Sequence, residues 1–239
     1  MAADIHRRAH ARNPERGETI GLNVILRPDE RINELLISVS QAIRQQFGAE
    51  FVLGTKQLSH MSAFQTAYPA SQRDEVETRV KQFASQWAAH RGPLEIVMGE
   101  VAPLIAKPGS QWSTLLFWDA RRNKLMTEFH QRLLQLLTPL RSPEMLAVHA
   151  ELRADPHVPQ SLIYSLNLYG TPLAGEAERP HFTFTRLTDA NDVEPALTLA
   201  RDMLAEWQGH ELTFDKVYLA NAGAHGTVTE IFTEYSLKE

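Results

Sequence analysis

Strand-like and helix-like hydrophobic periods alternate along almost the whole chain, and this alternation most narrows the folds that the chain can adopt. Alternating apolar residues predict strands over residues 21–27, 56–65, 94–101, 112–118, 179–187, 211–220 and 228–237. Helical spacing predicts helices over residues 30–47, 76–87, 125–140 and 193–207, with a short helix in the proline-broken stretch 142–160. The apolar run 162–169 fits either element.

The order of these elements favours an α+β fold. Strands and helices intermingle, the chain closes on a predicted hairpin, and no glycine-rich phosphate loop follows any strand. A doubly wound nucleotide-binding fold carries such a loop, so that class is disfavoured. No shift in composition marks a linker, and we expect residues 19–239 to form a single domain of two lobes. Residues 1–18 are polar and rich in arginine, which predicts a flexible N-terminal tail.

Composition excludes several kinds of chemistry. The chain of 239 residues contains no cysteine, so disulfides, thiol nucleophiles and thiolate-held metals are ruled out. A formal net charge of −5 argues against a protein that binds long double-stranded nucleic acid, which needs a basic face. No apolar run reaches the length of a membrane span, about 18 residues. We therefore expect a cytoplasmic protein without a membrane contact, and no cofactor or metal is predicted.

Two short sequences place an imidazole beside a hydroxyl group. His60 is followed two residues later by Ser62, and His181 is followed by Thr183 and Thr185. Side chains two apart share a face of a strand, so each strand would present these polar groups on one side and apolar residues on the other. The pattern predicts two candidate sites of the same kind, one early and one late in the chain.

This pairing suits the cleavage of a phosphodiester. A base must activate the attacking oxygen and an acid must protonate the leaving oxygen, and histidine can do either near neutral pH. Hydroxyl groups aimed at the non-bridging oxygens would stabilise the charge that develops on them. Two imidazoles facing one another across a groove could divide the work without a metal ion.

The two sequences resemble the signature of the two-histidine (2H) phosphoesterase superfamily, which includes the LigT-like 2′-5′ RNA ligases and cyclic phosphodiesterases. The resemblance covers nearly the whole chain after residue 20, and it also includes the opening strand and helix, the second motif and the closing hairpin: Leu22–Leu26, Glu30–Phe47, Pro180–Arg186, Thr213–Leu219 and Val228–Leu237. It implies two pseudo-symmetric lobes with antiparallel sheets around a central groove and helices outside. The substrate implied is a nucleotide or RNA end with a cyclic (2′,3′ or 1″,2″) phosphodiester or a 2′-5′ linkage.

By this resemblance His60 and His181 are the general acid and base, in an order left open, and Ser62 and Thr183 hold the phosphate. Two features depart from the family pattern. Ser62 stands where threonine is commoner, and the spacing of 121 residues from His60 to His181 exceeds that of compact members. The excess falls within residues 125–178, where an insertion would wall or cover the groove. Hydrolysis and ligation are not distinguished, and no oligomeric state is predicted.

Two other functions stay open. A nucleotide- or RNA-binding module could keep the fold without turnover, although a pure binder needs no acid–base pair. A metal-dependent hydrolase could use the same histidines, and a chelator would then abolish its activity. Several further residues are weaker candidates: Phe64, Tyr68 and Tyr169 for base stacking, Lys56, Arg179 and Arg186 for positive charge, and His149 and His157 for a metal. His225 is interpreted as a surface residue in a turn, and Arg186 is expected on the apolar side of its strand.

Overall fold

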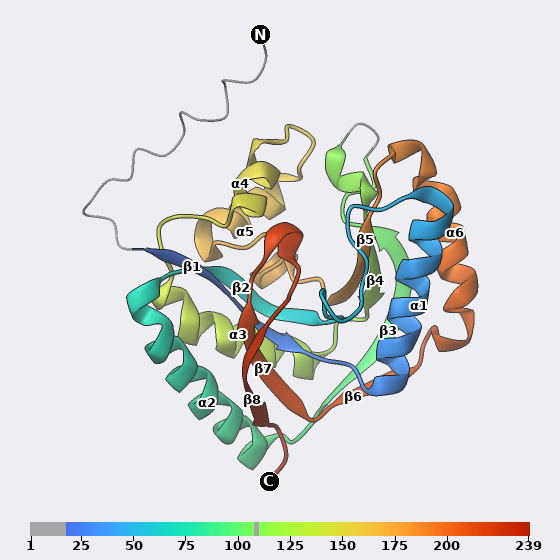
Figure 1. The fold of residues 1–239 in the computed structure, drawn as a ribbon. Helices are drawn as coiled ribbons and strands as arrows, with labels where there is room; N and C mark the ends of the chain where they lie inside the picture. The colour runs from blue at the N-terminus through green and yellow to red at the C-terminus, as the bar shows by residue number, and fades with distance from the viewer. Residues whose placement is uncertain (1–17, 108–109) are drawn as a thin grey trace.

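The computed structural model describes residues 18–107 and 110–239, and its centre is one antiparallel sheet. In this part of the chain the sheet has eight strands, which pair in the order β6-β3-β4-β5-β2-β1-β7-β8 (Figure 1). The strands are β1 (Thr19–Leu26), β2 (Met61–Pro69), β3 (Leu94–Pro103), β4 (Leu115–Ala120), β5 (His181–Arg186), β6 (Glu211–Phe214), β7 (Lys216–Asn221) and β8 (Ile231–Ser236). The predicted α+β class is confirmed.

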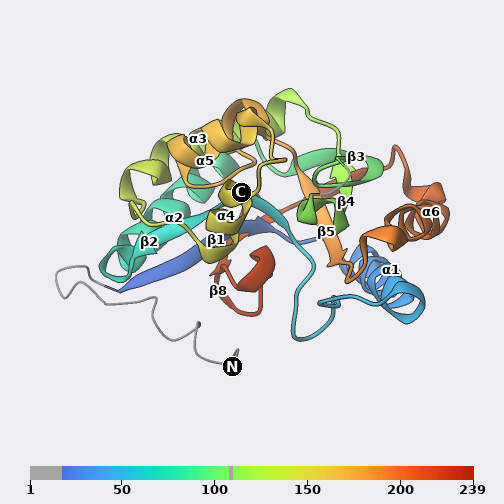
Figure 2. The same cartoon turned by 90° about the horizontal axis from the view of Figure 1, so that it is seen from above.

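Four of the helices pack against the sheet around the main hydrophobic core. They are α1 (Glu30–Phe47), α2 (Arg73–His90), α3 (Lys124–Leu137) and α6 (Val193–Met203). In both ribbon views α1 and α6 lie side by side over one half of the sheet (Figures 1 and 2). The apolar stripe of α1 begins after Asp29, whose carboxylate accepts from the Ile32 amide at 2.8 Å, and ends at Gly48 with a φ of 78°.

A second, smaller core lies on the opposite face of the sheet. There α4 (Ala147–Ala154) and α5 (Gln160–Tyr169) pack on residues of β4 and the segment before it. Alternation along β4 separates the two cores, because Leu116 and Trp118 face the main core while Leu115 and Phe117 face the second one.

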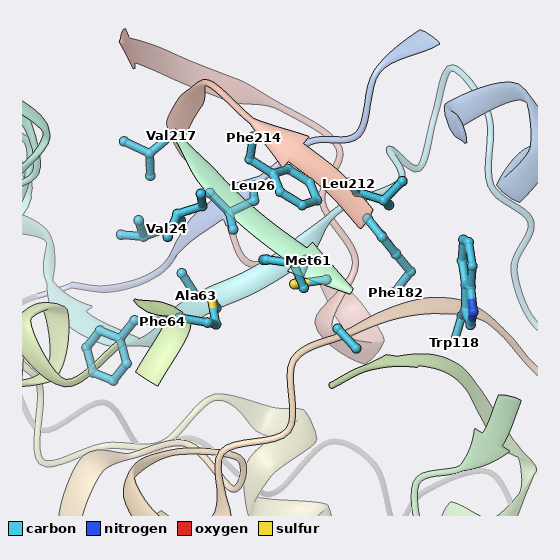
Figure 3. Packing of buried hydrophobic residues seen from close by; sticks show 14 of the residues in the cluster. Val24, Leu26, Met61, Ala63, Phe64, Trp118, Phe182, Leu212, Phe214 and Val217 are labelled. Carbon is cyan, nitrogen blue, oxygen red and sulfur yellow. The ribbon is translucent and has the colours of Figure 1, made fainter. Parts of the chain in front are cut away.

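The strands divide into two halves that meet at the middle of the sheet. One half holds β1, β2, β7 and β8, and the other holds β3, β4, β5 and β6. The halves join where β2 pairs with β5, with Met61 opposite Phe182, and both side chains point into the main core (Figure 3). The two lobes therefore share one continuous sheet, in keeping with the predicted bilobal fold.

Several predicted boundaries were wrong. Residues 56–60 are not in a strand, and β2 runs on to Pro69. Residues 111–114 form a short 3₁₀ helix before β4, because the Ser110 hydroxyl accepts from the Trp112 amide and caps it. The predicted strand 211–220 is divided at Asp215, and the run 162–169 belongs to a helix.

The predicted tail, residues 1–18, lies outside the described residues except for Glu18. Within the described ranges, no helix is both long enough and apolar enough to cross a membrane.

Candidate active site

One pocket is lined by all four side chains of the two motifs. His60, Ser62, His181 and Thr183 border a space of about 860 Å³, which includes the solvent at its mouth. These four residues are half-buried, whereas the residues between them are buried beneath the sheet. The alternation expected at both motifs is therefore present in the structure.

The pairing of β2 with β5 sets the spacing within the pocket. Extending the register from Met61 and Phe182 by one residue places each histidine opposite the hydroxyl residue of the other motif. Directly opposed side chains lie about 5 Å apart and diagonal ones about 7–8 Å apart. The two imidazoles are diagonal neighbours, so both can reach one phosphodiester bound between them.

Each imidazole is oriented by its own backbone. The Nδ1 atom of His60 lies 2.8 Å from the Leu58 carbonyl oxygen, and that of His181 lies 2.6 Å from the Arg179 carbonyl oxygen. A carbonyl only accepts, so Nδ1 carries the hydrogen in both rings. The Nε2 atom of each neutral ring is then the free acceptor.

Burial lowers the pKa of both histidines, because the pocket disfavours a charged ring. It is the largest cause of a pKa of about 3 for His181, which the Arg179 guanidinium and His60 lower further. At His60 the Leu58 and Gly226 carbonyls oppose the effect of burial, because they favour the protonated form, while nearby Arg27 adds to it. Both rings are therefore neutral at pH 7 in the free protein.

A β-bulge adds two polar side chains to the first motif. Ala63 has no partner on β1, so the register shifts there and both Ser62 and Gln65 face the pocket side. The Ser62 hydroxyl accepts from Asn23 Nδ2 at 2.8 Å, which leaves its own hydrogen free to donate to a ligand. Sequence alternation alone does not reveal this bulge, so Asn23 and Gln65 were missed.

Aromatic packing and an ion pair support the second motif. The His181 ring stacks on Phe117 with the ring centres 3.7 Å apart. Arg179, predicted as a source of positive charge, lies over the same phenyl ring and binds the Asp119 carboxylate through two nitrogens, at 2.9 and 2.8 Å. Its charge is therefore shared with a carboxylate rather than free for a phosphate.

The expected faces at the end of β5 were wrong. Phe184 is the unpaired residue of a second bulge, so the register with β4 shifts after Thr183. Thr185 is fully buried and donates to the Phe51 carbonyl at 2.6 Å instead of facing the pocket. Arg186 turns to the pocket side and lies 3.7 Å from the Glu50 carboxylate.

The three aromatic candidates for base stacking are not free. Phe64 and Tyr68 are buried in the main core, and Tyr169 packs against it. Lys56 is exposed and does not line the pocket. His225, interpreted as a surface residue, lines the pocket with a half-exposed side chain and a φ of 57°, in the left-handed region that few non-glycine residues adopt.

The remaining histidines near the pocket are held by backbone groups. His149 is buried and bonded to the Gly170 carbonyl at 2.9 Å. Among the described residues neither it nor His157 belongs to a group of three or more side chains suited to a metal. His130, which the sequence did not single out, also lines the pocket; its Nδ1 bonds the Ala63 carbonyl at 2.7 Å and its Nε2 accepts from the Gly175 amide at 3.3 Å.

Comparison with known proteins rests on structure, since no family model and no curated sequence matches this chain. TT0787 of Thermus thermophilus superposes with a TM-score of 0.55 and 12% identity, over 92% of this chain and 98% of that one. LigT of E. coli, in a crystal structure complexed with 3′-AMP, superposes with a TM-score of 0.51 and 8% identity, over 93% and 100%. Both are members of the two-histidine phosphoesterase superfamily.

The chain has the two-histidine phosphoesterase fold. The predicted resemblance is thus confirmed at the level of the fold, and it covers 98% and 100% of the two solved structures. Identities of 8 to 12% carry no residue roles with them, and those roles are argued below from the pocket itself.

Proposed function

We propose that this protein is a metal-independent phosphoesterase that hydrolyses a cyclic phosphodiester or a 2′-5′ linkage of a nucleotide or RNA end. One observation carries the proposal: two imidazoles, each fixed through Nδ1 to a carbonyl, line one pocket with a hydroxyl beside each. A shared fold with LigT, which was crystallised with 3′-AMP, supports a nucleotide as the ligand.

In this mechanism His181 is the base and His60 is the acid. Burial, together with the Arg179 guanidinium, lowers the pKa of His181 to about 3, so this ring stays neutral and can accept a proton. Burial also lowers the pKa of His60, but two carbonyls oppose this effect, and a bound anionic substrate raises the pKa. Electrostatics thus separates two imidazoles of similar geometry.

The bonds and protons balance over one turnover. Water loses a proton to Nε2 of His181 as its oxygen bonds to phosphorus, and the bond from phosphorus to the leaving oxygen breaks. The leaving oxygen takes the proton from Nε2 of His60. The hydroxyls of Ser62 and Thr183 donate to the non-bridging oxygens, where negative charge accumulates. His60 takes up its proton from solvent when the anionic substrate binds, and His181 loses its proton to solvent after turnover, which restores the two neutral rings of the free protein.

The test is hydrolysis of 2′,3′-cyclic nucleotides, ADP-ribose cyclic phosphate and 2′-5′ dinucleotides with EDTA present. We expect His60→Ala and His181→Ala each to lose about 10²–10⁴ in rate. His90→Ala is the matched control, because His90 is an exposed histidine on α2 with its Nδ1 bonded to the Gln86 carbonyl. Turnover that survives both pocket substitutions would disprove the histidine mechanism.

Two other outcomes identify the alternatives. Activity lost in EDTA and restored by a divalent cation would indicate a metal-dependent hydrolase. Nucleotide binding without turnover of any substrate would indicate a binding module of the same fold, and isothermal titration calorimetry with 3′-AMP measures it directly.

A further inference from the structure

Three segments that are far apart in the sequence enclose the pocket. Ser110 Oγ donates to Asp155 Oδ2 at 2.9 Å, which ties the segment before β4 to the end of α4. The α4 helix packs beside the turn that carries His225, as both ribbon views show (Figures 1 and 2). Arg186 joins that turn back to the first segment, with nitrogens 3.5 Å from His225 Nδ1 and 3.4 Å from Gln111 Oε1.

This ring of contacts limits the shape of the site. Each of the three segments contributes residues to the pocket lining, among them Trp112, Leu152 and His225. An open groove between two lobes would let a nucleic acid strand pass across the histidines. Here the ring closes that path on the side of the second core, so a ligand meets a wall beyond the reacting phosphate.

The charges near the pocket favour a ligand with few phosphates. Three arginines that line the pocket or contact its lining residues are each paired with a carboxylate: Arg179 with Asp119, Arg186 with Glu50 and Arg122 with Glu178. Arg27 directly follows β1 and its charge lowers the pKa of His60, and no ion pair of Arg27 occurs in the part of the chain that the structure describes. Longer RNA needs further cations along its backbone, and the net charge of −5 agrees with their absence here.

Apolar side chains of the second core form part of the pocket wall. Trp112, Phe117, Val148 and Leu152 line the pocket from the segment before β4, from β4 itself and from α4. Aromatic and aliphatic surfaces of this kind hold the planar, weakly polar body of a nucleobase. The pocket thus offers one anion position and one apolar position.

Within the proposed function, on which this inference rests, we propose that the substrate is a single cyclic nucleotide and that the ring excludes the same cyclic phosphate at the end of an RNA chain. The phosphodiester lies between the histidines, near Arg27, and the base lies against the apolar wall. A chain attached to the nucleotide would have to cross the ring.

The test compares kcat/KM for a 2′,3′-cyclic mononucleotide with kcat/KM for a short oligoribonucleotide that ends in the same cyclic phosphate. We expect the mononucleotide to be favoured by at least about tenfold. Raising the salt concentration should change its KM little, because no run of phosphates is bound. Equal or faster cleavage of the oligonucleotide, or a KM for it that rises steeply with salt, would overturn the proposal.

Opening the ring should weaken the discrimination. Asp155→Ala removes the acceptor of the Ser110 hydroxyl. We expect kcat/KM for the oligonucleotide to rise relative to kcat/KM for the mononucleotide. Asp189→Ala is the matched control. Asp155 and Asp189 each accept a hydrogen bond from the backbone amide two residues later, but Asp189 is not part of the ring. A ratio that changes equally in both variants contradicts the role of the ring.

Failure of this inference is distinguishable from failure of the proposed function. Histidine-dependent cleavage of both substrates at similar rates would overturn the size limit alone. If neither substrate is cleaved, the size limit can still be measured as binding affinity. Calorimetry then compares a nucleoside 3′-monophosphate with an oligonucleotide that ends in a 3′-phosphate. Tighter binding of the mononucleotide supports the size limit, and equal or tighter binding of the oligonucleotide overturns it.

Discussion

The two motifs share a backbone arrangement but differ in the charges around them. In both, the histidine Nδ1 bonds the carbonyl two residues earlier. His60, however, lies near Arg27, the residue that follows β1, whereas His181 is paired with Asp119 on β4. The hydroxyl of the first motif is held by an amide side chain, while the ring of the second rests on a phenyl group.

This difference explains how two like imidazoles can take opposite roles. Backbone symmetry orients both rings toward one phosphodiester. The neighbouring side chains then set which ring holds a proton more readily, through burial, carbonyl groups and guanidinium charge. In the proposed mechanism, geometry makes the pair and the surrounding charges assign the acid and the base.

A change of leaving group is the strongest test of which histidine is the acid and which is the base. His181→Ala should lose about 10²–10⁴ in rate on every phosphodiester, because the attacking water always needs a base. His60→Ala should lose as much on a nucleotide but far less on a nitrophenyl phosphodiester, whose leaving oxygen needs no proton. Steady-state kinetics of both variants on both substrates measures this. The reverse pattern would exchange the two roles.

The hydroxyl groups should differ in their dependence on neighbours. Ser62→Ala and Thr183→Val each remove a donor to a charged oxygen, worth about 1.5–3 kcal/mol, or about 10- to 150-fold in kcat/KM. Asn23→Ala should reproduce part of the Ser62 effect, because the Asn23 amide fixes that hydroxyl. Thr183→Ser should keep most of the activity. An Asn23 variant with full activity would show that Ser62 needs no such support.

His130 links β2 to the segment that precedes β5, and its loss should affect both. His130→Leu leaves the Ala63 carbonyl and the Gly175 amide without their partner, at a cost of about 1–3 kcal/mol for each buried group. We expect kcat to fall by about tenfold with KM nearly unchanged, since Ala63 adjoins Ser62. Urea unfolding and steady-state kinetics measure the two effects.

Ser40→Ala serves as the control for His130. The Ser40 hydroxyl donates to the Phe184 carbonyl and accepts from the Leu53 amide, so it is also a buried link but lies away from the pocket. It should lower stability without a comparable loss of kcat. Equal kinetic losses in the two variants would reduce His130 to a purely structural role.

The smallest effects are expected in the pH profile of kcat/KM. Burial is the main cause of the low pKa of His181, and Arg179 adds to it, so Arg179→Gln should raise that pKa. The base would then become protonated at a higher pH, and the acidic limb of the profile would move upward. Arg27→Gln should raise the pKa of His60 and so extend the basic limb upward. Arg179→Lys and Arg27→Lys keep the charge and should leave the limbs in place.

Sequence periodicity predicted the fold class and brought the four motif residues together, because strand alternation is a local property. It did not predict the bulges at Ala63 and Phe184, which depend on the partner strand and reverse the faces of Gln65 and Arg186. Asn23 and His130 act across 39 and 67 residues of sequence, so no local pattern marks them.

The strand order also has a consequence for synthesis on the ribosome. The half of the sheet that carries His181 is complete once Phe214 has been made, because β3, β4, β5 and β6 all precede that point. The half that carries His60 waits for β7, which pairs with β1, and for β8, which pairs with β7 and ends at Ser236. All strands of the half that holds the later motif are therefore made before the other half is complete, and a chain shortened after Phe214 would contain both motifs but would leave β1 without its neighbour β7.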